Sequence, residues 1–269
     1  MRNLYKKRPI LSMLLFFLVI MVAGKILGLI INPIVPDPHV ASFIVRLIVI
    51  ALIIIMNIKI FNINMGRARH KALLGIILLL PLFIPMWVNI SQLTPEDLEK
   101  LSIYDYAVVG LDAFAVGAFE EILMRGILLN GFLIAFSHKK HGIWLAVISS
   151  SILFGIAHFV NLLSGSPLDS TLFQVFYATM FGIAFCAAYL RTNNLLIPIL
   201  IHGIIDYLSF LQDAANPAST QDPGIMHLGI VVLTILVILF AIPAIFSVVF
   251  LRSSKREEII NMNLNMRQN

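Results

Sequence analysis

Residues 105–136 read DYAVVGLDAFAVGAFEEILMRGILLNGFLIAF, a run long and apolar enough to cross a membrane as one helix. Ionisable side chains interrupt this run and two later apolar runs: Asp112, Glu120, Glu121, Arg125, His158, His202 and Asp206. Burying such groups away from water is costly, and inside membrane helices they usually mark a functional site. The sequence therefore predicts a polar site whose residues come from three separate segments of a hydrophobic protein.

The whole chain has the composition of a polytopic membrane protein. Of its 269 residues, 59% are hydrophobic and only 12% are charged, and the mean hydropathy is +0.96. A helix needs about 20 apolar residues to cross the hydrocarbon core, and about eight segments meet this requirement: 10–31, 40–61, 72–90, 105–136, 142–163, 172–190, 195–211 and 225–251. We expect an all-α bundle of these helices. The first segment is longer than the core of a signal peptide and no A-x-A site follows it, so we interpret it as an anchor.

Basic residues occur in alternate connections between these segments. Connections that hold Lys and Arg stay in the cytoplasm, which places on the inner side the N-terminus and residues Lys59, Arg67, Arg69, Lys71, Lys139, Lys140, Arg191, Arg252, Lys255, Arg256 and Arg267. The other connections have Lys100 as their only base and carry these acids: Asp37, Glu96, Asp97, Glu99, Asp169, Asp213 and Asp222. Both termini should therefore face the cytoplasm. The net charge of +5 reflects contact with inner-face lipid rather than a nucleic-acid surface, and no DNA- or RNA-binding motif is present.

Neither a repeat nor a long linker divides the chain, so residues 1–269 are predicted to form one membrane domain. The single cysteine, Cys186, excludes an intramolecular disulfide and a Cys-rich zinc site. We expect it to be a packing residue.

The motif EExxxR at Glu120–Arg125 separates two carboxylates. Residues four apart share a helix face, so Glu121 and Arg125 can form an ion pair, while Glu120 projects roughly 100° away from Glu121. A free, desolvated carboxylate suits proton transfer, which makes Glu120 the candidate general base. The alternative is a purely structural ion network that joins helices.

Two further motifs place histidines on other predicted helices. In FxxxH, Phe154 precedes His158 by one turn and can cover its imidazole, and the small residues at 149–151 and 155 permit close approach of a neighbouring helix. In HxxxD, His202 and Asp206 share one face, and Pro198 is expected to loosen the turn before them. With Glu120 and His158 they could bind a water molecule or a divalent metal such as zinc; the alternative is a simple interhelical hydrogen bond.

The ordered occurrence of EExxxR, FxxxH and HxxxD on three predicted helices resembles the signature of the CPBP family of intramembrane endopeptidases, the CAAX protease and bacteriocin-processing (Abi) family. The resemblance covers about residues 119–207, and it implies that residues 105–211 form the catalytic core. It also implies an eight-helix, all-α membrane fold with cytoplasmic termini, and peptide-bond hydrolysis at or within the bilayer.

Carried over by motif position, the resemblance makes Glu120 the water-activating carboxylate and places His158 and His202 around the water and the developing oxyanion. Asp206 becomes their polar partner, Glu121 and Arg125 fill the remaining motif positions, and Phe154 is supporting. Many members of the family carry Asn where this chain has Asp206. An additional carboxylate would help to hold a cation, so a zinc-type metallopeptidase and a glutamate-dependent peptidase both remain open.

The resemblance implies a peptide or membrane-protein substrate, with prenylated CAAX-type tails, peptide pheromones and bacteriocin precursors as candidates. We expect an integral, multi-pass protein of a bacterial cell membrane; the oligomeric state is not predicted.

Three alternatives stay open. An aspartyl mechanism would use Asp112 and Asp206, although the GxGD pattern is absent around Asp112. A solute carrier would be expected to show repeat symmetry, which is not seen. A non-enzymatic bacteriocin-immunity or scaffold protein would use the same buried polar cluster to bind a partner.

Overall fold

The computed structural model describes residues 2–66, 71–91, 93–216 and 225–264. Within these residues the chain forms helices and no strand, which confirms the all-α prediction. Four charged residues used above to predict the orientation lie outside the described residues: Arg67, Arg69, Asp222 and Arg267.

The elements follow one another along the chain as α-helices joined by short 3₁₀ and π segments, the latter marked η. Their bounds are α1 Arg2–Lys7, α2 Pro9–Ile31, α3 Pro38–Met56, η1 Asn57–Phe61, α4 Ala72–Leu79, η2 Leu80–Leu82, α5 Phe83–Ile90, α6 Pro95–Glu99, α7 Ile103–Glu121, η3 Ile122–Leu129, α8 Asn130–Phe136, α9 Gly142–Ala157, η4 His158–Ser164, α10 Leu168–Thr192, α11 Leu196–Ala215, η6 Met226–Leu228, α12 Gly229–Phe250, η7 Ser253–Lys255 and α13 Arg256–Leu264.

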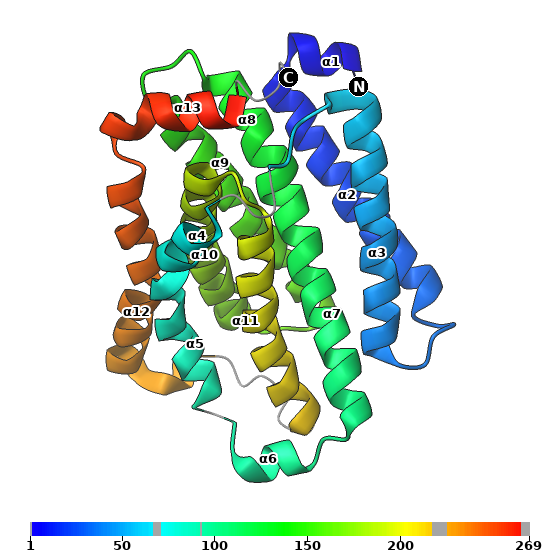
Figure 1. Ribbon diagram of the computed structural model, residues 1–269. Coiled ribbons are helices and arrows are strands. Elements are labelled where there is room, and N and C mark those ends of the chain that lie inside the picture. The colour runs from blue at the N-terminus through cyan, green and yellow to red at the C-terminus, as the bar shows by residue number, and fades with distance from the viewer. Residues whose placement is uncertain (1, 67–70, 92, 217–224, 265–269) are drawn as a thin grey trace.

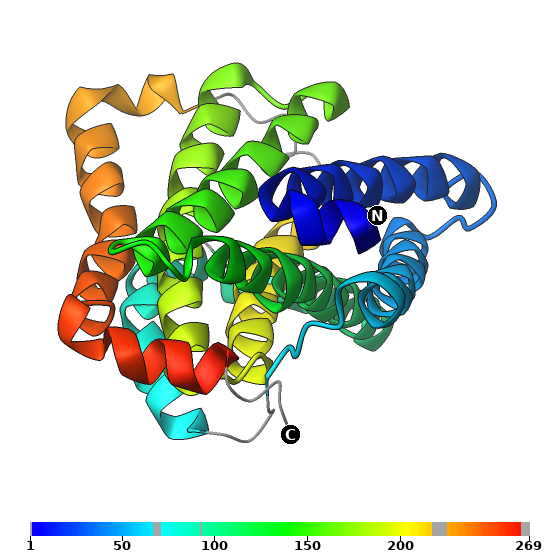
Figure 2. The same cartoon turned by 90° about the horizontal axis from the view of Figure 1, so that it is seen from above.

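The long helices run side by side, with the three motif-bearing segments in the interior. Figure 1 shows α2 and α3 on one side of the bundle and α12 on the other, with α7, α9, α10 and α11 between them, and the view along the bundle in Figure 2 agrees. The most extensive contacts join α7 to α11 and α9 to α10. Of these four helices, α7, α9 and α11 carry motif residues.

Six described helical segments are long and apolar enough to cross a membrane: Pro9–Ile31, Pro38–Phe61, Gly142–Ser164, Leu168–Thr192, Leu196–Ala215 and Met226–Phe250. They correspond to six of the predicted segments, and large side chains such as Leu29 (70% exposed) and Ile230 (78% exposed) face outward from the first and last of them. Apolar surface of this extent suits contact with lipid. The chain is therefore an integral, multi-pass membrane protein.

The other two predicted segments are helical but differ from simple spans. Residues 72–90 are split into α4 and α5 by the 3₁₀ turn η2, which contains Pro81 and so lacks one backbone donor. Residues 103–136 form a continuous helical rod, but they carry five charged side chains: Asp105, Asp112, Glu120, Glu121 and Arg125. Length and composition thus support six spans, and the predicted total of about eight is not confirmed.

The short helices α1 and α13 lie at the same end of the bundle, and α6 lies at the opposite end (Figure 1). This arrangement agrees with the predicted placement of both terminal regions on one side. That this side is the cytoplasm remains a prediction from the distribution of basic residues.

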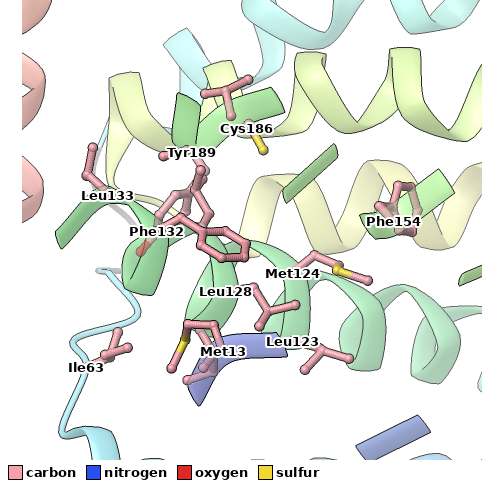
Figure 3. Close-up of a cluster of buried hydrophobic side chains, with 14 of the residues drawn as sticks. Met13, Ile63, Leu123, Met124, Leu128, Phe132, Leu133, Phe154, Cys186 and Tyr189 are labelled. Carbon is pink, nitrogen blue, oxygen red and sulfur yellow. The ribbon is translucent and has the colours of Figure 1, made fainter. Parts of the chain in front are cut away.

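A hydrophobic core packs around η3, the segment that carries Arg125. Figure 3 shows Leu123, Met124 and Leu128 of η3 surrounded by Met13 of α2 and side chains of α8, α9 and α10. Cys186 belongs to this core and is fully buried, in agreement with its predicted packing role. The motif residues are therefore held by a rigid, fully packed segment.

Glycines let the motif helices approach at backbone distance. A Cβ added at Gly117 of α7 would lie 2.8 Å from the backbone nitrogen of Gly203 of α11, and one added at Gly155 of α9 would lie 2.6 Å from the carbonyl oxygen of Val175 of α10. Any larger side chain would push these helices apart. The small residues of the FxxxH segment thus permit the close packing that the sequence predicts.

Candidate active site

Glu120 and Glu121 are the last two residues of α7, at the point where the α-helix widens into the π-helix η3. A π-helical segment is uncommon and is frequently found at functional sites. Here it carries Arg125 and changes the helical register immediately after the two carboxylates. The sequence predicted a single regular helix over this region, because a π segment has no distinctive residue pattern.

Asn130 stabilises the return from the π-helix to α8. Its backbone N–H donates to the carbonyl of Ile127, and its side-chain Nδ2 donates to the carbonyl oxygens of Arg125 (3.1 Å) and Gly126 (3.0 Å) and to Tyr189 Oη (2.8 Å). The side chain is fully buried. Asn130 was not singled out in the sequence, where its only signal is a polar residue inside an apolar run.

The predicted ion pair between Glu121 and Arg125 is present. Arg125 Nη1 lies 2.7 Å from Glu121 Oε1, and both side chains are fully buried. The same carboxylate oxygen accepts a hydrogen bond from His202 Nδ1 at 2.9 Å. Glu121 therefore joins the EExxxR motif to the HxxxD motif, a connection that the sequence did not reveal.

Two aromatic rings enclose Arg125 and His202. The Arg125 guanidinium carbon lies 4.6 Å from the ring centroid of Phe154 and 5.1 Å from that of Phe185, an arrangement that stabilises a desolvated cation. Phe185 also stacks on His202, with centroids 5.3 Å apart, and Phe154 meets the same imidazole edge-on. Phe185 was not identified from the sequence, because an aromatic residue in a membrane helix is most often a packing residue.

Glu120, in contrast, is not paired with Arg125 and lines a cavity; the sequence predicted only that it projects away from Glu121. Glu120 Oε2 lies 3.5 Å from His202 Nε2, and Asp206 Oδ2 lies 3.6 Å from the same nitrogen. Both distances are too long for strong direct hydrogen bonds and suit polar groups that share a water molecule. His202 is thus held through Nδ1 and presents Nε2 to two carboxylates.

His158 is the first residue of the 3₁₀ segment η4, directly after α9. Its Nδ1 donates to the carbonyl oxygen of Phe154 at 2.9 Å, which leaves Nε2 available. Phe154 contacts this imidazole edge-on with centroids 5.2 Å apart, so it covers His158 as predicted. The same ring contacts His202, and Phe154 is therefore shared by both histidines.

Pro198 does not loosen α11, contrary to the sequence prediction. The helix begins at Leu196, and Pro198 occupies its first turn, where a missing backbone N–H removes no intrahelical hydrogen bond. Asn194 Oδ1 instead accepts from the backbone nitrogens of Leu196 (2.9 Å) and Ile197 (3.3 Å) and caps the helix start. His202 and Asp206 therefore lie on a regular helix, and the irregular geometry is found at η3 and η4.

Five of the motif residues line one cavity of about 550 Å³, whereas Glu121 and Arg125 are not among its lining residues. Its lining includes the predicted residues Glu120, Phe154, His158, His202 and Asp206. Five polar side chains that the sequence analysis did not identify also line it: Arg46, Asn161, Gln174, Tyr177 and Ser209. Asn161 Nδ2 donates to Gln174 Oε1 at 2.7 Å, so η4 and α10 are tied together beside His158.

The residues offer ligand types suitable for zinc but not an assembled metal centre. Both histidines donate from Nδ1 and leave Nε2 free, which is the usual orientation of a metal-binding imidazole. However, no group of three or more His, Cys, Asp or Glu side chains within the described ranges is arranged to hold a metal ion. The donor chemistry fits a metal, and the geometry does not.

Asp112 belongs to a different polar cluster. Its carboxylate accepts hydrogen bonds from His39 Nδ1 (2.9 Å) and from the hydroxyl of Ser42, both on α3. Asp112 is not among the residues that line the cavity containing Asp206, an arrangement that does not favour the aspartyl alternative. The contacts indicate that Asp112 joins α7 to α3.

Residues 103–208 match the family model described as type II CAAX prenyl endopeptidase Rce1-like. No curated protein and no solved structure matches the chain. The matched segment contains all three motifs and the helices that line the cavity.

Proposed function

We propose that this chain, whose residues 103–208 belong to the CAAX protease family, hydrolyses a peptide bond in a membrane-associated or lipidated peptide by means of a water molecule activated by Glu120. The observation that carries the proposal is the position of His202: Glu121 holds its Nδ1 at 2.9 Å while its Nε2 faces Glu120 and Asp206. Such a preorganised set of groups suits general acid–base chemistry.

The proposed reaction begins with a water molecule between Glu120 and His158. Glu120 accepts a proton from this water, and the hydroxide oxygen adds to the carbonyl carbon of the scissile bond. His158 orients the water through its free Nε2. The two carbonyl electrons move to oxygen and create an oxyanion, which needs hydrogen-bond donors nearby.

His202 supplies such a donor in its imidazolium form. Three carboxylates, those of Glu120, Glu121 and Asp206, lie within 4.0 Å of its nitrogens, so an imidazolium has its counter-charges in place. Glu120 then returns its proton to the leaving nitrogen as the carbon–nitrogen bond breaks. The buried pair of Glu121 and Arg125 takes no proton and orients His202.

The central experiment compares the purified wild-type protein with Glu120→Gln, using labelled peptides that carry a prenylated cysteine near an apolar carboxyl end. Glutamine preserves the size of the side chain and cannot accept a proton, so we expect cleavage to fall by about 100-fold or more. Glu96→Gln, which changes an exposed acid in the connection before α7, is the matched control and should cleave normally. A folded Glu120→Gln protein that still cleaves would refute the role of Glu120.

Two additional measurements separate the competing functions. Cleavage that survives a strong chelator supports hydrolysis by the side chains alone, whereas a loss that zinc restores supports a metal held by Glu120, His158, His202 and Asp206. If the wild-type protein binds a peptide partner without cleaving it, the non-enzymatic immunity or scaffold function is supported instead.

A further inference from the structure

A second cavity adjoins the candidate active site. It measures about 500 Å³ and lies between α2, α3 and η4. Five residues line both cavities, namely Met21, Arg46, Phe119, Val160 and Asn161. Because Phe119 and Arg46 belong to this shared boundary, a single extended ligand could occupy both spaces.

The two cavities differ in charge. The carboxylates of Glu120 and Asp206 line only the catalytic cavity, Lys25 lines only the second cavity, and Arg46 lines both. The second cavity has no acid among its described lining residues. The remainder of its wall is mostly apolar, with Asn32, Ser42, Asn161 and Ser164 as further polar groups. A cationic space of this kind, bordered by membrane helices, favours an anionic ligand.

Arg46 lacks an ion-pair partner in the part of the chain that the structure describes. No described carboxylate lies within 4.0 Å of its guanidinium or of the Lys25 ammonium, and Arg46 Nε is buried without a hydrogen-bond partner. This contrasts with Arg125, whose guanidinium is paired to Glu121. Asp206, which lines the same cavity, acts on Arg46 only from a longer distance. A partly buried cation is stabilised by a close counter-charge, and a bound ligand can supply it.

We propose that Arg46 and Lys25 form a subsite that binds a carboxylate of the peptide substrate, next to the bond that is cleaved. This inference rests on the proposed peptidase function. The carboxylate comes either from the carboxyl end of the peptide or from an acidic side chain close to the scissile bond. Arg46 binds it directly, because it borders both cavities, and Lys25 adds to the positive potential farther along.

The location favours a peptide carboxylate over a lipid phosphate. Arg46 lines the cavity that contains the catalytic carboxylate, so an anion at this position is already beside Glu120. A charged group there would also align the peptide, since the acids of the catalytic cavity repel a carboxylate and the bases of the second cavity attract it.

The test measures binding and cleavage separately. Three labelled apolar peptides with the same prenylated cysteine are compared: one with a free carboxyl end, one with an amide end, and one with an amide end and an aspartate near the scissile bond. Dissociation constants are measured with the intact Glu120→Gln protein, which binds without cleaving. The same dissociation constants are then measured for the Glu120→Gln protein with one further substitution: Arg46→Gln, Arg46→Lys or Lys25→Gln. Lys59→Gln, near the C-terminal end of the helical segment that contains Arg46, is the matched control.

We expect the free-acid peptide to bind about tenfold or more tightly than the amide, and Arg46→Gln to abolish this difference while leaving the amide peptide unaffected. Arg46→Lys should retain part of this difference in affinity, and Lys59→Gln should retain all of it. In the catalytic protein, Arg46→Gln should raise KM for the free-acid peptide with kcat nearly unchanged. Tight binding of the aspartate peptide as well would show that an acidic side chain is also accepted.

Equal affinity for the acid and amide peptides, or no binding of either, would overturn the subsite. The same conclusion follows if Arg46→Gln reduces binding of phosphatidylglycerol vesicles but leaves peptide selectivity intact, because the anion would then be a lipid phosphate. Selective binding without any cleavage by the wild-type protein would instead contradict the peptidase function and leave the carboxylate subsite standing.

Discussion

His202 donates from Nδ1 to Glu121 Oε1 at 2.9 Å, although 81 residues separate the two along the chain. This bond orients the imidazole so that Nε2 faces Glu120 and Asp206. The two adjacent acids therefore have different surroundings. Glu121 is an inaccessible anchor, paired with Arg125, and Glu120 borders a cavity where a substrate could reach it.

The first prediction concerns the stability of the buried ion pair. Glu121→Gln leaves the fully buried Arg125 guanidinium without its counter-charge, which should lower the free energy of unfolding by about 3–5 kcal/mol. Replacing both members together, as Glu121→Gln with Arg125→Met, removes the unpaired charge and should recover most of that loss. Unfolding in detergent measures both, and similar stability for the two variants would contradict the prediction.

Cleavage should respond differently from stability. Both variants lack the carboxylate that orients His202, so peptide hydrolysis should remain at least about 100-fold below wild type even where the fold is restored. Recovery of cleavage in the double variant would show that Glu121 serves only to neutralise the charge of Arg125.

A second prediction concerns the crossing of α7 and α11. Gly117→Ala places a Cβ 2.8 Å from the backbone nitrogen of Gly203, so the helices must separate and Glu120 must shift relative to His202. We expect a loss of about 1–3 kcal/mol in unfolding free energy and a decrease in kcat. Gly110→Ala on the same helix is the control, since its nearest neighbouring atom is 3.5 Å away. Equal effects of the two substitutions would argue against a tight crossing.

A third prediction tests the π-helix. Asn130→Leu removes the side-chain donor that serves the carbonyls of Arg125 and Gly126 and the hydroxyl of Tyr189. Leaving these buried polar groups without a hydrogen-bond donor should lower the free energy of unfolding by about 1–3 kcal/mol or more. The π-helical register of η3 should also become less well defined. Hydrogen exchange across residues 122–130 measures this directly. Ser137→Ala, which loses a partly buried bond to the Ile134 carbonyl, should change it little.

A fourth prediction concerns the response of the C-terminal helix to acid. The hydrogen bond from Arg191 Nη1 to Glu258 Oε2 lowers the pKa of Glu258 below its usual value of 4.5, with Lys255 contributing in the same direction. Because the pKa is lower in the folded state, the stabilising contribution is complete above pH 4.5 and is lost as the pH falls through the lowered value.

We therefore expect α13 to be held against α10 at neutral pH and to become accessible to proteases as the pH falls below this range. The effect should be modest, because the Glu258 side chain is 40% exposed and screened by solvent. Glu258→Gln should show the accessible state already at neutral pH and little further change in acid. An unchanged pH response in that variant would assign the transition to another group.

Local sequence patterns were sufficient for several of these features. Apolar runs of helical length predicted the membrane helices, since the period and length of such runs are visible without knowledge of their neighbours. The four-residue spacing of Glu121 and Arg125 predicted their ion pair for the same reason. The small residues around Gly155 predicted close packing on one face, although they could not name α10 as the helix that packs there.

Only the tertiary structure decided which atoms meet across the three motifs. The bond from His202 to Glu121, the two rings around Arg125 and the cationic space beside the cavity of Glu120 all depend on how α3, α7, α9, α10 and α11 pack. The chain sequence contains no local signal for these contacts, because helix rotation and crossing are set by side chains distributed over several helices at once. The amino-acid sequence alone determined a helical membrane protein with three polar motifs, and packing between helices determined that Glu120 faces the cavity while Glu121 is buried.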